Sequence, residues 1–308
     1  MKVTVRFSDF WENSNSTIDK FLVPLIESVY QSEVQLERDS RKIVDLEVFS
    51  VFPSRRNFSR RILNKVSNYT HETTRLMEGT VPAKSKKSMW FSGENKRAPI
   101  ANRYDTYLGF EPEGLLANSH YLPLWVLNFD NFGKGPAHGF TSTVIQQEEL
   151  LLPRKFERSS KNKFCCAFLG NPTSFRVGVL KKLGDVETLG LFGGAFGNKV
   201  EDKLLVSKEY RFCFAFENNL YPGYVTEKLL EGYLSNTIPL YWGMDSHLFF
   251  NAKAFVNLYD FATLEGFLNA VKVLNSDEDL YAHAYEQPLL NRKYDIPGLV
   301  EKLRNDLL

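Results

Sequence analysis

The sequence predicts an α/β protein made of two units in series. Segments that alternate like strands are separated by amphipathic helical segments, which is typical of parallel sheets covered by helices. From Leu152 to Lys163 the hydrophobic pattern lapses into proline, serine and basic residues, and a second alternation follows. The chain has 308 residues, which is enough for two domains. We therefore predict one domain over residues 1–155 and another over residues 156–308.

The first domain opens with a strand, and a helix follows it. Val3–Phe7 alternates as a half-buried strand does, and Ser16 or Thr17 can cap the helix. The apolar face of this helix is predicted to comprise Ile18, Phe21, Leu22, Leu25, Ile26 and Val29. Alternation and β-branched residues predict further strands at residues 43–52, 88–91 and 104–110.

The second domain repeats the alternation of strands and helices after the proline-rich stretch. Strands are predicted at residues 164–169, 211–216, 237–242 and 254–258. Helices are predicted at residues 175–183, 224–234, 264–274, 278–286 and 297–307. Gly190, Gly193, Gly194 and Gly197 predict a glycine-rich loop. For the final helix, the alternative prediction is that it packs back on the N-terminal domain.

Composition and charge narrow the class of protein. The formal net charge is +1, so nothing indicates a nucleic acid as a partner of the whole protein. The basic residues nevertheless form three clusters, and each is interpreted as a solvated loop or linker. The first cluster comprises Arg55, Arg56, Arg60 and Arg61; the second Lys84, Lys86 and Lys87; the third Arg154, Lys155, Arg158, Lys161 and Lys163. The alternative is contact with anionic lipid, above all through the first cluster, or with a phosphate-bearing acceptor.

Cysteine usage and the N-terminus favour the cytoplasm. Cys165, Cys166 and Cys213 lie in apolar runs and are predicted to be buried thiols rather than disulfides or zinc ligands. The first residues alternate like a strand and lack the apolar core of a signal peptide. No stretch approaches the ~18 apolar residues of a membrane span. We therefore expect a cytoplasmic protein, with peripheral contact at the inner face of the membrane as the alternative.

Residues 210–243 carry the functional argument. An apolar strand ends at Phe216, polar residues and a loop follow, and a helix is predicted to start near Thr226. A strand, a polar loop and a helix N-terminus form an anion site at the carboxyl edge of a sheet. Lys228 adds a positive charge, and Glu227 can accept hydrogen bonds from sugar hydroxyls. The structural alternative is that Thr226 is only a cap, Glu227 only a complement to the helix dipole and Lys228 only a surface charge.

This segment resembles the signature of glycosyltransferase family 10, the α-1,3/1,4-fucosyltransferases. The similarity runs from Phe216-Glu217-Asn218 through Tyr224-Val225-Thr226-Glu227-Lys228 to Ile238-Pro239-Leu240-Tyr241-Trp242-Gly243. Similar segments extend over most of the chain, and agreement is weak near residues 54–87 and 112–160. They include Phe7-Ser8-Asp9-Phe10-Trp11, Ser92-Gly93-Glu94-Asn95, and Asn171-Pro172 with Arg176.

The resemblance implies the GT-B fold, two Rossmann-like domains that face each other across a cleft. It implies that the C-terminal domain binds GDP-fucose and that the N-terminal domain binds the acceptor. By this similarity Arg176 and Lys228 contact the pyrophosphate, and Asn218 lies in the diphosphate region. Glu227 and Tyr224 contact the ribose or nearby hydroxyls, and Glu94 is the general base.

The implied reaction is an inverting transfer of L-fucose from GDP-β-L-fucose to a hydroxyl of an N-acetylglucosamine-containing, lactosamine-like glycan, with an α-1,3 linkage favoured. One carboxylate takes the acceptor proton, and the two cations stabilise the leaving GDP without a metal ion. Asp277-Glu278-Asp279 has a metal-binding form, but helix capping explains it. Two alternatives stay open: a transferase of the same fold for another nucleotide sugar or acceptor, and a catalytically silent protein that binds nucleotide or sugar.

Overall fold

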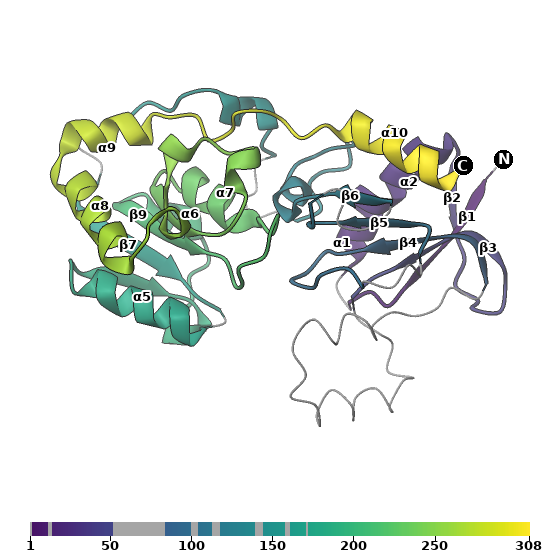
Figure 1. Cartoon of the computed structure of the whole chain (residues 1–308), viewed down its shortest axis with the longest axis horizontal. Coiled ribbons are helices and arrows are strands. Elements are labelled where there is room, and N and C mark those ends of the chain that lie inside the picture. The colour runs from purple at the N-terminus through teal and green to yellow at the C-terminus, as the bar shows by residue number, and fades with distance from the viewer. Residues whose placement is uncertain are drawn as a thin grey trace. The chain divides into compact units, whose positions relative to one another are not determined.

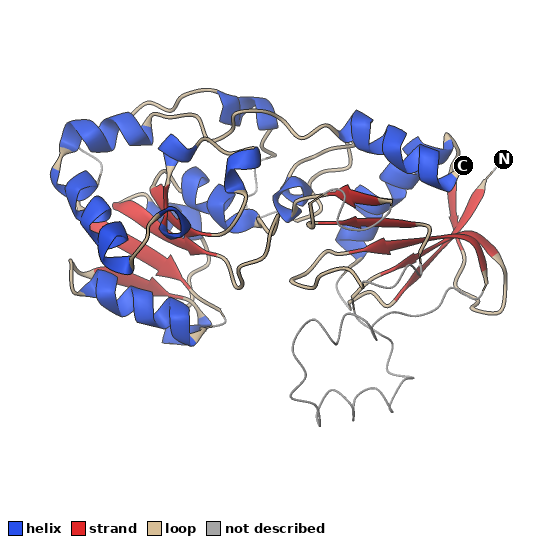
Figure 2. Cartoon of the chain, in the orientation of Figure 1, coloured by secondary structure: helices blue, strands red, loops and turns tan. Residues whose placement is uncertain are grey.

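A computed structural model describes residues 2–11, 14–51, 84–99, 104–112, 118–138, 144–157, 161–170 and 172–308. The chain divides into two compact units. Unit 1 comprises Met1–Gly139 and Asp295–Leu308, and unit 2 comprises Phe140–Tyr294. Each unit is built around a parallel sheet with helices beside it, which confirms the predicted α/β class (Figure 2). The first basic cluster, Arg55 to Arg61, lies outside the described residues.

Unit 1 holds a six-stranded sheet in the order β2-β1-β3-β4-β5-β6, and every pairing is parallel. Its strands are β1 Val3–Ser8, β2 Val34–Leu36, β3 Val44–Phe49, β4 Ser85–Phe91, β5 Thr106–Gly109 and β6 Ser119–Tyr121. The predicted strands near residues 3, 43, 88 and 104 are confirmed. The sequence did not predict β2 and β6, because three-residue strands at the sheet edges carry almost no pattern.

One continuous helical run crosses over after β1. It comprises α1 (Asn15–Thr17), a π-helical stretch (Ile18–Leu22) and α2 (Val23–Tyr30), and it buries the predicted apolar face. The predicted caps are wrong, because the run begins before them. The Ser16 hydroxyl donates to the Ala137 carbonyl at 2.8 Å, and the Thr17 hydroxyl pairs with His138 Nε2 at 2.9 Å.

The final helix, α10 (Ile296–Leu307), belongs to unit 1. It packs on α2, β5 and β6 (Figure 1). Asp306 fixes its last turn, because its Oδ2 accepts from the Thr106 hydroxyl at 2.8 Å and lies 2.6 Å from His120 Nε2. The Lys87 ammonium donates to the Asp306 carbonyl at 2.8 Å, and Lys86 pairs with Asp45 at 2.7 Å. Lys86 and Lys87 therefore lie on strand β4 and not in a solvated loop.

Unit 2 holds a five-stranded parallel sheet in the order β11-β10-β9-β7-β8. Its strands are β7 Lys163–Phe168, β8 Leu189–Phe192, β9 Tyr210–Phe216, β10 Ile238–Trp242 and β11 Val256–Asn257. Its α-helices are α5 Ser174–Gly184, α6 Lys203–Ser207, α7 Glu227–Leu234, α8 Leu264–Ser276 and α9 Glu278–Tyr285. These bounds confirm every strand and helix predicted for this region, and β8 and α6 are additional.

The core of unit 2 joins the sheet to α5, α8 and α9. Phe212, Phe214 and Phe216 recur at every second position of β9 and belong to the same buried cluster as Leu183 of α5 and Phe267 of α8. Helix α7 packs on β9 and β10. A Cβ added to Gly232 of α7 would lie 3.2 Å from Pro239 and 3.5 Å from Ala215, so the helix runs close to both strands.

Strand β8 replaces part of the predicted glycine-rich loop. Gly190 lies inside this strand, and a Cβ there would meet the Tyr210 hydroxyl oxygen at 2.1 Å. The glycine is therefore required by a neighbouring ring and not by a turn. The turn itself follows at Gly193, whose φ is +104°.

Two basic residues of the predicted linker, Arg154 and Lys161, make hydrogen bonds within unit 2. The Arg154 guanidinium donates to the carbonyls of Tyr285 (3.0 Å), Tyr233 (2.6 Å) and Thr237 (3.0 Å). The Lys161 ammonium is buried in the same unit. These contacts explain why the division of the chain falls at 139/140, ahead of the predicted 155/156. Among the described residues, no helix is both long and apolar enough to cross a membrane.

Candidate functional site

The site is built on the loop that joins β9 to α7. The strand ends at Phe216, and the helix begins at Glu227. Gly223 has a φ of +75°, which favours glycine, and its N–H donates to Asp245 Oδ2 at 2.8 Å. This contact ties the loop to the segment that follows β10. The loop therefore has one defined path between the sheet and the helix.

Glu217 is a buried anchor under this loop. Its side chain is fully buried, and it accepts hydrogen bonds from the Thr226 N–H (2.8 Å) and the Thr226 hydroxyl (2.7 Å). The Tyr241 hydroxyl also donates to it, at 3.1 Å. Burial raises the pKa of Glu217 above its ordinary value, although the nearby Lys228 opposes this. The Thr226 hydroxyl also accepts from Lys228 Nζ at 3.0 Å, and it makes no capping hydrogen bond to α7.

Lys228 lies between two carboxylates. Its Nζ is 3.4 Å from Glu217 Oε2 and 3.1 Å from Glu227 Oε1. Burial lowers the pKa of Lys228, but the two carboxylates outweigh this, and the pKa is raised overall. Burial also opposes ionisation of Glu227, yet Lys228 and local hydrogen bonds bring its pKa below the ordinary value. A charged ammonium thus stands at the start of α7, and its side chain is only 18% exposed.

A second cation comes from α5. The hydroxyl of Thr173 caps this helix by accepting from the Arg176 N–H at 3.3 Å. The Arg176 guanidinium is buried and donates to Asn218 Oδ1 at 2.9 Å. Burial lowers the pKa of Arg176, and the carboxylates of Glu217 and Glu227 oppose this, so the guanidinium stays charged.

These groups line one cavity of about 240 Å³ within unit 2. The cavity lies between the sheet and α7, and α6 contributes to its wall. Its lining comprises Phe168, Gly170, Arg176, Lys203, Leu204, Cys213, Phe214, Ala215, Asn218, Glu227, Lys228, Glu231, Gly232 and Ser235. Four of the five predicted donor residues, Arg176, Asn218, Glu227 and Lys228, are therefore brought together. Tyr224 is a buried residue of the same loop and is not among the lining residues.

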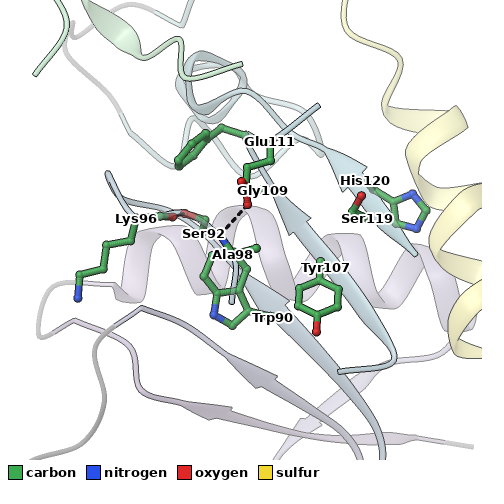
Figure 3. Close-up of a pocket in the computed structure, with 10 residues that line it drawn as sticks. Trp90, Ser92, Lys96, Ala98, Tyr107, Gly109, Glu111, Ser119 and His120 are labelled. Carbon is green, nitrogen blue, oxygen red and sulfur yellow. Dashed lines mark hydrogen bonds between the residues drawn. The ribbon is translucent and has the colours of Figure 1, made fainter. Parts of the chain in front are cut away.

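Glu94 belongs to unit 1 and is exposed just after β4. The turn that carries it is held by Ser92, whose hydroxyl donates to the carbonyls of Glu94 (3.0 Å) and Lys96 (2.7 Å). A small cavity beside this turn is lined by Trp90, Tyr107 and others, and the Lys96 side chain extends away from it (Figure 3). Its volume is about 10 Å³, which suits one water molecule and not a sugar.

The other residues considered as metal ligands or reactive groups have structural roles. Asp277 caps α9 by accepting from the N–H groups of Asp279 and Leu280, as the sequence predicted. The three cysteines are buried free thiols, which is also confirmed. Across the described residues, no group of three or more His, Cys, Asp or Glu side chains is placed to hold a metal ion.

Sequence reasoning missed three polar residues of this site. Glu217 belongs to the family motif, but the sequence indicates no role for it. Its buried carboxylate accepts two hydrogen bonds from Thr226 and so fixes this residue. Lys203 and Glu231 also line the cavity. The spacing of Glu231, four residues after Glu227, was the available signal, because such residues share one helix face.

Comparisons with known proteins agree with this geometry. Residues 158–287 match the family described as glycosyltransferase family 10 (fucosyltransferase), C-terminal part. The chain is 28% identical over 229 residues to the alpha-(1,3)-fucosyltransferase FucT of Helicobacter pylori, covering 66% of this chain and 47% of that protein. It is 29% identical over 136 residues to human 4-galactosyl-N-acetylglucosaminide 3-alpha-L-fucosyltransferase 9, covering 42% of this chain and 38% of that one. The chain thus spans less than half the length of these relatives.

Solved structures extend the likeness to the whole fold. A crystal structure of an alpha1,3-fucosyltransferase covers 99% of this chain and 90% of its own, with a TM-score of 0.68 and 20% identity. A second, with GDP-fucose, has a TM-score of 0.68 at 19% identity and the same coverage. This likeness confirms the predicted GT-B fold class. Residues 158–287, which lie within the second unit, therefore form a glycosyltransferase family 10 (fucosyltransferase) C-terminal domain.

Proposed function

We propose that this protein transfers L-fucose from GDP-fucose to a hydroxyl of an N-acetylglucosamine-containing glycan, with inversion at the anomeric carbon and an α-1,3 linkage. The observation that carries the proposal is the grouping of Arg176, Lys228 and Asn218 around one cavity at the start of α7. Two buried cations and an amide suit a diphosphate, and the family's members are fucosyltransferases.

The donor is held by unit 2 in this proposal. Arg176 and Lys228 take the pyrophosphate oxygens, and the open N–H groups of α7 add to the positive potential. Glu227 accepts hydrogen bonds from the ribose hydroxyls, and Asn218 orients the Arg176 guanidinium through its 2.9 Å contact. Tyr224 is buried within the loop that joins β9 to α7, and its contact with the ribose or nearby hydroxyls remains part of this proposal.

The transfer is a single displacement. The acceptor oxygen attacks C1 of the fucosyl group, the bond from C1 to the phosphate oxygen breaks, and GDP leaves with the bonding electrons. Glu94 takes the proton from the acceptor hydroxyl. The developing charge on GDP is stabilised by Arg176 and Lys228, so the step needs no metal ion in this proposal. The transition state has oxocarbenium character.

The test is single-turnover transfer from GDP-fucose to N-acetyllactosamine in the presence of EDTA. We expect turnover by the wild type and a loss of about 10²–10⁴-fold in rate for Glu94→Gln, with GDP affinity unchanged. Glu265→Gln is the matched control, since Glu265 is an exposed carboxylate in the first turn of α8. Equal rates for Glu94→Gln and the wild type would exclude Glu94 as the base. Wild-type protein that binds GDP without turnover of any glycan would instead indicate a silent binding protein.

A further inference from the structure

The donor cavity continues past the two cations to a second charged pair. Lys203 is the first residue of α6, and its Nζ lies 3.3 Å from Glu231 Oε2 of α7. Both residues line the same cavity as Arg176 and Lys228. The Glu231 side chain is only 22% exposed, and the Lys203 side chain is 51% exposed. The pair therefore presents one acceptor group and one donor group to whatever fills this part of the cavity.

The charged groups of α7 lie on two successive helical turns. Glu227 and Glu231 are four residues apart, so they share one helix face and lie about 6 Å from each other. Glu227 and Lys228 are the first two residues of α7, Arg176 of α5 lines the same cavity, and Glu231 lies one turn further along α7. With phosphates at the cations and ribose at Glu227, the base reaches the level of Glu231.

Resting on the proposed function, we infer that Lys203 and Glu231 recognise the base of the donor nucleotide and select guanine. Guanine presents two adjacent donors, N1–H and the exocyclic N2 amino group, beside the acceptor O6. A carboxylate accepts from two adjacent N–H groups, and an ammonium donates to the neighbouring carbonyl. Adenine and cytosine place a ring acceptor beside a single amino donor, and uracil has one N–H between two carbonyls. Each would leave part of the pair unsatisfied.

Burial supports this assignment. Burial raises the pKa of the Glu231 carboxyl, and Lys203 opposes this only in part. A carboxylate in this position gains from N–H donors that a ligand brings. A site built to hydrogen-bond one group discriminates against an analogue that lacks it, because its own polar atoms are then unpaired.

The experiment measures dissociation constants of GDP and inosine diphosphate, which differ only in the exocyclic amino group. We expect the wild type to bind GDP about tenfold more tightly, and Glu231→Ala to reduce this preference to about twofold or less. Lys203→Met should weaken both nucleotides about tenfold and keep their ratio, because both carry O6. Glu265→Gln is the control, and thermal unfolding verifies that each variant is folded.

The outcomes separate this inference from the proposed function. Equal affinity of the wild type for the two nucleotides, or an unchanged preference in Glu231→Ala, would overturn the inference and leave the proposed function standing. So would unchanged GDP affinity in Lys203→Met. A wild-type protein that binds no GDP would overturn the proposed function and this inference with it.

Discussion

Two regions of unit 2 bury basic side chains, and they use them differently. At the cavity beside α7, Arg176 and Lys228 contact an amide and carboxylates beside about 240 Å³ of open space. In the stretch before β7, Arg154 and Lys161 donate to backbone carbonyls, and aromatic rings cover the Arg154 guanidinium. A buried cation is therefore no sign of function by itself. What distinguishes a binding cation is a neighbouring cavity and partners that a ligand can join.

The Arg154 guanidinium is held by aromatic rings and backbone carbonyls of unit 2. The guanidinium carbon lies 3.6 Å from the centre of the Tyr233 ring and 3.9 Å from that of Tyr285. All three of its nitrogens donate to backbone carbonyls. Burial lowers the pKa of Arg154, with partial compensation from the tyrosines. Such an arrangement joins the segment to α7, α9 and the start of β10.

The same substitution in the two regions should have opposite effects. Arg176→Met is expected to lower kcat/KM for GDP-fucose by about 10³-fold, because a charge that stabilises the leaving diphosphate is lost. The free energy of unfolding should change by about 1 kcal/mol, the typical net contribution of a hydrogen bond such as the one from Arg176 to Asn218. Transfer assays and chemical unfolding measure the two quantities. A loss of stability without a loss of transfer would show that Arg176 is structural.

Arg154→Met is the matched variant. It leaves three carbonyls without their donor and removes two cation–π contacts, so the free energy of unfolding should fall by about 3 kcal/mol. The folded fraction should keep wild-type kcat/KM, because Arg154 does not line the cavity. Denaturant unfolding and transfer assays below the unfolding transition measure both. Wild-type stability, or a large loss of kcat/KM in fully folded protein, would remove the distinction between the two regions.

The two regions also differ in what their sequence could predict. The 210–243 segment has a clear strand pattern, a loop and a helix start, so its elements were predicted correctly, and three of its four predicted donor residues, Asn218, Glu227 and Lys228, line one cavity. Its hidden part is Glu217, because nothing local shows that a carboxylate will be buried under its own loop. The 152–163 stretch was misjudged because proline and basic residues are typical of linkers. Its order depends on partners such as Tyr285, more than 120 positions away, which no local pattern shows.

Two short elements of unit 2, β8 and α6, were also not predicted from the sequence. Strand β8 contains Gly190, and glycine there depends on the Tyr210 ring on another strand. The short helix α6 has its cap at Asp202, whose side chain accepts from the Leu205 N–H, but five residues are too few for a periodic signal. Elements held by distant contacts are harder to predict than elements with their own repeating pattern.

Lys161 gives the prediction with the smallest expected effect. Burial of its charge destabilises the folded state even though the ammonium donates hydrogen bonds. Its ammonium donates to the carbonyls of Lys208 (3.1 Å) and Tyr210 (3.0 Å), and burial, followed by repulsion from Arg154, lowers its pKa to about 8. The folded state therefore releases this proton at a lower pH than the unfolded chain, whose lysine pKa is about 10.4. Between about pH 8 and 10 the unfolded state binds more protons, so this residue makes the free energy of unfolding rise with pH.

We expect that rise to amount to about 2 kcal/mol between pH 8 and 10, because the pKa is about 8 in the folded state and about 10.4 in the unfolded chain. Lys161→Met lacks the titrating group, so the difference in unfolding free energy between wild type and variant should shift in favour of the wild type as the pH rises from 7.5 to 10. Lys163→Met is the control, since the side chain of Lys163 is 50% exposed and pairs with Glu209 at the surface. A pH-independent difference for Lys161→Met would mean that the ammonium is as well solvated in the folded protein as in the unfolded chain, and the segment would then be the loose linker that its composition suggests.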